Sequence, residues 1–175
     1  TASVFDAVSR HFQGREYVPA LRFISDYHRH PAWLDAMEAR IRSHWDLHGR
    51  ADCLVFSFHG IPQRFADRGD PYPRQCQASA EAIADRLNLS PDHWRLTYQS
   101  RFGREPWLQP YTDKSLQAMA GQGLNTLDII CPGFAVDCLE TLEEITVENR
   151  HLFLQTGGME LRYISALNDE PGHVA

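Results

Sequence analysis

Two apolar runs in this chain each lead into side chains that can bind a metal ion or move a proton. Residues 53–58 are followed directly by His59, and residues 127–131 are followed by Asp137 and Glu140. If both runs are parallel strands of one sheet, these side chains lie beyond the carboxyl ends of the strands, where open α/β sheets bind ligands. An imidazole facing a carboxylate there can bind a divalent cation or transfer protons near neutral pH.

Acidic side chains continue beyond Glu140 at helical spacing. Positions 137, 140, 144 and 148 would share one face of a helix over residues 135–149, because they are spaced at i, i+3, i+7 and i+11. Four carboxylates on one face repel each other, and a stripe leading from a pocket toward solvent could relay protons or cations. We therefore expect Asp137 and Glu144 to belong to such a path, whereas an ordinary solvated face is the better interpretation of Glu148.

Two long polar loops, residues 59–71 and 101–111, follow predicted strands and so reach the same edge. The side chains expected at that rim are Tyr72, Gln99, Ser100, Arg101, Arg104, Trp107 and Tyr111. Aromatic planes with a few basic and amide groups suit a flat, largely apolar ligand that carries carboxylates. The alternative for any one of these residues is simple packing within its loop.

Helix-like and strand-like segments alternate along the chain. Periodicity and stop signals predict helices over residues 2–12, 31–45, 72–87, 112–121 and 135–149. Short apolar or β-branched runs predict strands over residues 21–25, 53–58, 94–100, 126–131 and 160–165. This order predicts an α/β fold, a parallel sheet with helices on both faces, in one domain over residues 1–175.

Composition excludes several classes of protein. The chain has 175 residues, a formal net charge of −6 and 43% hydrophobic residues, as expected of one globular domain. No apolar run approaches the ~20 residues that span a bilayer, and the mild acidity argues against a nucleic-acid partner. The first residues do not have the pattern of a signal peptide.

The chain has no familiar metal-cluster or hydrolase motif. Its four cysteines, at positions 53, 76, 131 and 138, form no C-x-x-C pair, so we expect reduced thiols in a cytoplasmic protein. Phosphate-loop, serine-hydrolase and zinc-protease motifs are absent. We also expect Ser57 to face away from His59, which argues against a Ser–His dyad.

Four segments have a more specific pattern when taken together. They are Ser57-Phe-His59-Gly-Ile-Pro, Gly69-Asp-Pro-Tyr-Pro73, Gln99-Ser-Arg-Phe-Gly-Arg-Glu-Pro-Trp107 and Pro132-Gly-Phe-Ala-Val-Asp137-Cys-Leu-Glu140. In this order the chain resembles ferrochelatase of the bacterial type, the enzyme that inserts ferrous iron into protoporphyrin IX to form protohaem. The resemblance implies the C-terminal half of a class II chelatase fold, in which two flavodoxin-like halves enclose the porphyrin. It also implies that an N-terminal half, which is not in this chain, supplies the opposite wall of the cleft.

The resemblance implies a role for particular residues. His59 would be the active-site histidine and metal ligand, and Glu140 its acidic partner, with the division between proton acceptor and metal donor left open. Asp137 and Glu144 match acidic positions near the pocket, and Trp107 matches an aromatic at its rim. Gln99 and Ser100 belong to the same substrate-binding or proton-path group. Fe(II) would be a substrate, with no further cofactor and no iron–sulfur cluster.

The sequence is also compatible with two alternative functions. A related chelatase could insert cobalt or iron into a sirohydrochlorin-type ring, although the pattern over residues 99–107 favours protoporphyrin. A non-catalytic tetrapyrrole- or metal-binding half-domain is the alternative from another class. The expected location is the cytoplasm, with peripheral contact to the inner membrane through the other half as a further option.

Overall fold

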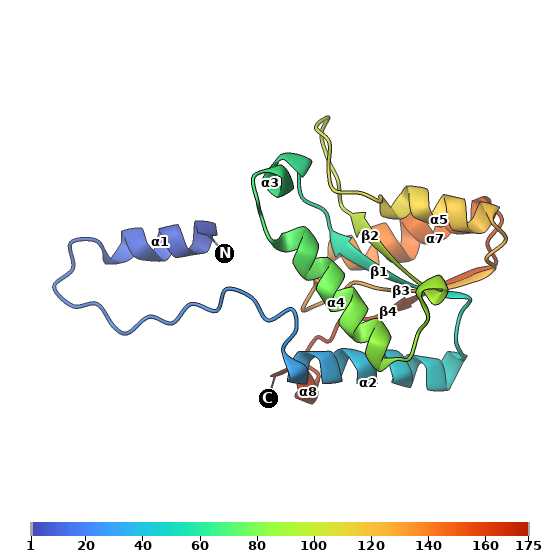
Figure 1. Ribbon diagram of the computed structural model, residues 1–175, viewed down its shortest axis with the longest axis horizontal. Coiled ribbons are helices and arrows are strands. Elements are labelled where there is room, and N and C mark those ends of the chain that lie inside the picture. The colour runs from blue at the N-terminus through green and yellow to red at the C-terminus, as the bar shows by residue number, and fades with distance from the viewer. Residues whose placement is uncertain (1, 175) are drawn as a thin grey trace.

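A four-stranded parallel sheet forms the centre of the molecule (Figure 1). The computed structural model describes residues 2–174. The strands are β1 (Cys53–His59), β2 (Trp94–Gln99), β3 (Thr126–Ile130) and β4 (Glu160–Ile164), in the spatial order β2-β1-β3-β4. This order corresponds to the first four strands of the flavodoxin-like arrangement, and the predicted α/β architecture is confirmed.

Helices cover both faces of the sheet because the strands are apolar on both sides. On β1, Leu54, Phe56 and Phe58 pack with α2 (Pro31–His48) and α4 (Tyr72–Arg86). The alternate residues of β1 face the opposite layer, which contains α5 (Thr112–Gly121) and α7 (Arg150–Gln155). Alternation along a strand directs successive side chains to opposite faces, so one apolar run serves two cores.

Short elements complete the fold. They are α1 (Ala2–Phe12), α3 (Gln63–Asp67), the 3-10 turn η1 (Pro91–His93), α6 (Leu139–Leu142), the π-helix η2 (Glu144–Asn149) and α8 (Pro171–Val174). Within residues 2–174, no helix combines the length and the apolar character that crossing a membrane would require.

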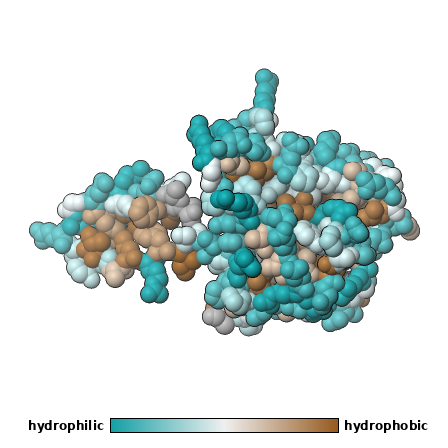
Figure 2. Space-filling view, in the orientation of Figure 1, coloured by the Kyte–Doolittle hydropathy of each residue, from teal (hydrophilic) through white to brown (hydrophobic). Residues whose placement is uncertain are grey.

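The predicted strand over residues 21–25 is wrong. This segment is extended but unpaired. Together with α1 it forms an arm, residues 2–27, whose last residues, Asp26 and Tyr27, lie against the body while the rest stands apart (Figure 1). Leu21, Phe23 and Ile24 are exposed, and apolar side chains gather over the arm in Figure 2. A strand needs a neighbour for its backbone N–H and C=O groups, and the body offers none at this position.

The predicted helix over residues 135–149 is also only partly correct. Residues 135–138 form a turn, α6 has four residues, and the chain then continues through the π-helix η2 into α7, which ends at Gln155. Cys138 has an extended backbone, with φ of −148°, and acts as the N-cap of α6. The helical spacing assumed for the acidic stripe therefore fails at both ends of α6, since a π-helix has wider turns.

Replacing Gly158 by alanine should destabilise the protein. A Cβ at Gly158 would overlap the ring of Phe153, a fully buried residue of α7. We expect the free energy of unfolding to fall by about 1–3 kcal/mol, measured by urea denaturation. Gly121→Ala is the matched control, because a Cβ there meets nothing within 4 Å. Equal stability of Gly158→Ala and the wild type would contradict this packing.

Candidate active site at the carboxyl edge of the sheet

His59 is the last residue of β1 and lies at the point where the strand order reverses between β1 and β3. Its Nδ1 is 2.6 Å from the carbonyl oxygen of Gly60, which can only accept, so Nδ1 carries a proton and, in the neutral ring, Nε2 has the lone pair. The ring is half-buried, with Trp107 and Phe134 at centroid distances of 6.3 and 6.1 Å. This imidazole is therefore oriented, and one of its nitrogens is able to accept a proton or bind a metal.

Glycine is required immediately after His59 because the chain passes close to its neighbours there. Gly60 donates its backbone N–H to the carbonyl of Gln99 at 2.8 Å. A Cβ at Gly60 would lie 3.0 Å from that carbonyl oxygen and 3.2 Å from the ring of Trp107. The close approach holds the ends of β1 and β2 together directly behind the imidazole.

Glu140 lies in the first turn of α6 and faces the same hollow as His59. The hollow has a volume of about 430 Å³, and Ser100, Phe102, Leu139 and Glu144 also line it. Hydrogen bonds from the Cys138 thiol and from its own backbone N–H lower the pKa of Glu140, and the nearby His59 lowers it further. The structure thus brings His59 together with an ionised carboxylate, as the two apolar runs predict.

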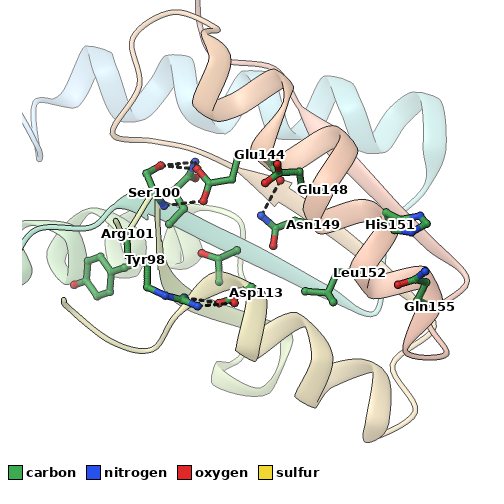
Figure 3. Close-up of a pocket in the computed structure, with 12 residues that line it drawn as sticks. Tyr98, Ser100, Arg101, Asp113, Glu144, Glu148, Asn149, His151, Leu152 and Gln155 are labelled. Carbon is green, nitrogen blue, oxygen red and sulfur yellow. Dashed lines mark hydrogen bonds and ion pairs between the residues drawn. The ribbon is translucent and has the colours of Figure 1, made fainter. Parts of the chain in front are cut away.

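Glu144 also lines this hollow, but its carboxylate is engaged in hydrogen bonds. Its Oε1 accepts the backbone N–H of Ser100 at 2.7 Å, and its Oε2 accepts the hydroxyl of Ser100 at 2.6 Å (Figure 3). Ser100 adopts a φ of +63°, which side chains rarely favour, and this conformation directs both of its donors to one carboxylate. These two hydrogen bonds connect Glu144, the first residue of the π-helix, to the end of β2.

A second hollow of about 460 Å³ adjoins this wall, between α5 and α7 (Figure 3). Glu144 and the exposed Glu148 line both hollows, and His151 lines the second. Arg101 and Asp113 also line the second hollow, and they form a bidentate ion pair with N···O distances of 2.6 and 2.8 Å. Of the acidic stripe over positions 137, 140, 144 and 148, the last three residues line the first hollow together, although not on one regular helix.

Asp137 does not face the hollow. Its carboxylate accepts hydrogen bonds from Tyr163 at 2.6 Å and from Asn168 at 2.9 Å, and also from Thr141 and the backbone of Ala166 at 3.2 Å. The prediction that it shares a helix face with Glu140 is wrong, because Asp137 precedes α6. Through these hydrogen bonds, Asp137 connects the segment before α6 to residues at and just after the end of β4.

Trp107 lies deeper than a rim position. Its side chain is 5% exposed, its ring contacts Phe102 at a centroid distance of 4.9 Å, and its indole N–H has no hydrogen-bond partner among residues 2–174. Gln99, the last residue of β2, is also buried, and its amide donates to the backbone carbonyl of Glu140 at 2.7 Å. Both residues therefore contact residues that line the hollow: Trp107 contacts Phe102, and Gln99 contacts Glu140.

The expectation that Ser57 faces away from His59 is wrong. Side chains two residues apart on a strand share a face, and Ser57 hydrogen-bonds to Gln99, the residue that pairs with His59 across β1 and β2. The spacing of the two residues was the signal that places Ser57 on the same face of β1 as His59.

His59 and Glu140 are the candidate metal ligands of the first hollow. Within residues 2–174, no group of three or more His, Cys, Asp or Glu side chains is arranged to hold a metal ion. The four thiols are free, and those of residues 53, 76 and 131 are buried. His59 and Glu140 could supply two ligands, and any further ligand would have to come from water, from a substrate or from another polypeptide segment.

Fold and site together define a flavodoxin-like α/β domain that carries a histidine–carboxylate pair at its switch point. The ferrochelatase family profile matches residues 1–175, and the chain belongs to this family.

Curated relatives lead to the same family. The chain is 56% identical to a ferrochelatase of Methylococcus capsulatus, over 99% of this chain and 53% of that protein. It is 51% identical to a ferrochelatase of Idiomarina loihiensis and 52% identical to one of Nitrosococcus oceani, over 99% of this chain and 48% and 47% of those proteins. The chain therefore spans about half the length of these bacterial relatives, and the half that it matches is their C-terminal half.

Replacing Asp137 by asparagine should destabilise the protein in a pH-dependent way. Burial raises the pKa of Asp137, but hydrogen bonds led by those of Asn168 and Tyr163 outweigh burial and leave the pKa below its usual range. A depressed pKa contributes stability above the unfolded value of ~3.9, and this contribution is lost as pH falls through the folded pKa. We expect Asp137→Asn to lower the free energy of unfolding by about 1–3 kcal/mol at pH 7.

The difference between Asp137→Asn and the wild type should begin to narrow as pH falls below ~4, where the unfolded carboxyl protonates, and should vanish only below the depressed pKa of the folded state. Chemical denaturation at pH 7 and at pH 3.5 measures both values. A difference that stays constant over this range would show that the ionised carboxylate contributes nothing to stability.

Proposed function

We propose that this chain forms the His59/Glu140 wall of a cleft in which ferrous iron is inserted into protoporphyrin IX to give protohaem. The observation that carries the proposal is the meeting of an oriented imidazole and an ionised carboxylate in one hollow, at the switch point of a chain that belongs to the ferrochelatase family. The reaction is that of a lyase and is the last step of haem biosynthesis.

The residue types suit this reaction. Metal insertion requires the porphyrin to lose two pyrrole N–H protons while Fe(II) enters the ring. His59 presents Nε2 with a lone pair, which can accept a proton or bind the metal, and the ionised Glu140 can perform the other role. Iron enters and stays as Fe(II), so the proposal includes no redox cofactor and no iron–sulfur cluster.

The surface around the hollow suits a flat apolar ligand. Phe102 and Leu139 line it, and they are 75% and 74% exposed. Trp107 packs behind Phe102 and stiffens that side. Large exposed apolar side chains at a concave site commonly mark the place where a ligand or another protein surface is bound.

Glu144 and Glu148 are proposed to continue the polar side of the cleft as a path for protons or cations. Both line the hollow that holds His59 and Glu140, and both reach the second hollow beside α7. The two hydrogen bonds from Ser100 keep Glu144 in place along this path. For Asp137 we propose a supporting role, because its carboxylate is engaged with Tyr163 and Asn168.

A second α/β half is proposed as the partner of this chain. The relatives are about twice as long, and the arm over residues 2–27 has exposed apolar side chains that the body does not cover. Such side chains are commonly buried against another surface in the native protein. We propose that the other half covers the arm and closes the cleft. The proposed location is the cytoplasm, with any contact to the inner membrane made through the other half and no nucleic-acid partner.

Replacing His59 by alanine in the full-length protein should abolish metal insertion while porphyrin binding persists. Loss of a residue that transfers protons or delivers metal typically lowers kcat by about 10²–10⁴-fold. Anaerobic insertion of Fe(II), followed by the loss of porphyrin fluorescence, measures kcat. Glu140→Gln should lower kcat in the same way, because an amide is neither a base nor a strong metal ligand.

His93→Ala is the matched control, since His93 hydrogen-bonds to Ser90 before β2, away from the carboxyl edge. Normal kcat in His59→Ala would contradict the proposed site. Porphyrin affinity without turnover in the wild type would instead indicate a non-catalytic tetrapyrrole-binding protein. Faster turnover with a sirohydrochlorin-type ring would indicate the related chelatase.

The chain on its own should bind porphyrin weakly and insert no metal, because one wall of the cleft is absent. Restoring the preceding half should raise insertion from background to measurable turnover, in the same fluorescence assay. Equal rates for the chain alone and for the full-length protein would contradict the two-walled cleft.

A further inference from the structure

Gln99 occupies an unusual position among the residues of the site. It is 2% exposed and lies beneath the hollow, at the end of β2. Its carbonyl oxygen accepts from the hydroxyl of Ser57 at 2.8 Å and from the thiol of Cys131 at 3.2 Å. Its nitrogen donates to the backbone carbonyl of Glu140 at 2.7 Å. One buried amide thus connects β1, β2, the residue that follows β3, and α6.

The direction of this amide is determined by its neighbours. If the amide were flipped, its oxygen would face the carbonyl oxygen of Glu140, and two acceptors would meet at hydrogen-bond distance. Its NH₂ group would then face Cys131, whose thiol is a weak acceptor. Burial raises the pKa of Cys131 well above its usual range, so the thiol keeps its proton and can donate. Ser57 and Cys131 therefore hold the donor side of Gln99 toward Glu140.

The polar contacts continue away from the hollow. Ser57 Oγ also lies 2.9 Å from Thr112 Oγ1, at the start of α5, and Thr112 Oγ1 lies 2.9 Å from Thr97 Oγ1 on β2. Ser57 and Thr97 are 0% exposed. A buried polar network of this kind is rigid when every member has a partner, and removal of one member leaves the others unsatisfied.

The segment that Gln99 holds has little apolar support. α6 has four residues, and only Thr141 among them is buried. Leu139 and Leu142 are exposed, so apolar packing does not fix the helix in place. The hydrogen bond from Gln99 to the backbone of Glu140 is therefore a principal constraint on where that residue sits relative to His59.

We propose that Ser57 and Cys131 are positioning residues for metal insertion, which act by holding the amide of Gln99 and, through it, the backbone of Glu140 opposite His59. Neither residue lines the hollow. The inference rests on the proposed function of the His59/Glu140 pair. It assigns two buried residues, one of them on the strand that ends at His59, to the geometry of the reacting groups.

The test uses the full-length protein with matched variants. Ser57→Ala removes a donor to Gln99, whereas Thr97→Val removes a buried hydroxyl of the same network that does not touch Gln99. Small displacements of reacting groups lower kcat strongly. We expect Ser57→Ala to lower kcat about tenfold, with the KM for porphyrin within about twofold of the wild type. Thr97→Val should keep kcat within about twofold, even where its thermal stability falls by the same amount.

A second pair covers the case in which Ser57→Ala does not fold. Cys131→Ala removes the other donor to Gln99 and should lower kcat, whereas Cys131→Ser retains a donor and should restore most of the activity. The side-chain NH₂ resonance of Gln99 gives a readout without turnover. It should be protected from exchange with water in the wild type and lose this protection in Ser57→Ala and Cys131→Ala.

Three outcomes are distinct. If the wild type is active and kcat is unchanged in both Ser57→Ala and Cys131→Ala, the positioning role is overturned and the proposed function stays intact. Equal losses of kcat in Ser57→Ala and Thr97→Val show general destabilisation and also overturn it. An inactive wild type with unaltered protection of Gln99 refutes the proposed function itself, and the positioning role with it.

Discussion

Parallel strand direction is the constraint on which the rest of the site depends. All four strands run the same way, so each ends at the same edge of the sheet. After β1 the chain enters the layer of α2 and α4, whereas after β3 it enters the layer of α5 and α7. The two connections leave in opposite directions, and the crevice between them is uncovered. His59 and Glu140 are the first polar groups to reach it from either side.

Polar contacts, rather than apolar packing, set the geometry of the acidic segment. The two cores on either side of the sheet are mainly apolar, but α6 and the π-helix are held by Gln99 and Ser100, which bond to Glu140 and Glu144. Hydrogen bonds are directional, whereas hydrophobic burial is not. A wall fixed in this way keeps carboxylates at defined positions while its exposed apolar side chains remain available to a ligand.

The sequence predicts the body of this molecule well because its signals are local. Strand and helix periods identify the four strands of the sheet and the covering helices α2, α4 and α5, and the ends of two strands identify His59 and Glu140. Residues 21–25 were predicted wrongly because β-propensity does not supply a pairing partner. The acidic stripe was predicted as one regular helix because a π-helix has no signature in the spacing. Asp137 was misplaced for a different reason: it precedes α6, and its partners Tyr163 and Asn168 are distant in sequence.

The most direct test of the account is the location of a bound metal in crystals of the full-length protein. Anomalous diffraction after soaking with Zn(II), used in place of Fe(II), would locate the ion independently of turnover. The account predicts a peak within ~2.2 Å of both His59 Nε2 and a carboxylate oxygen of Glu140. A peak found only elsewhere, for example at Glu148 or His151, would contradict the claim that these two residues form the metal-binding wall.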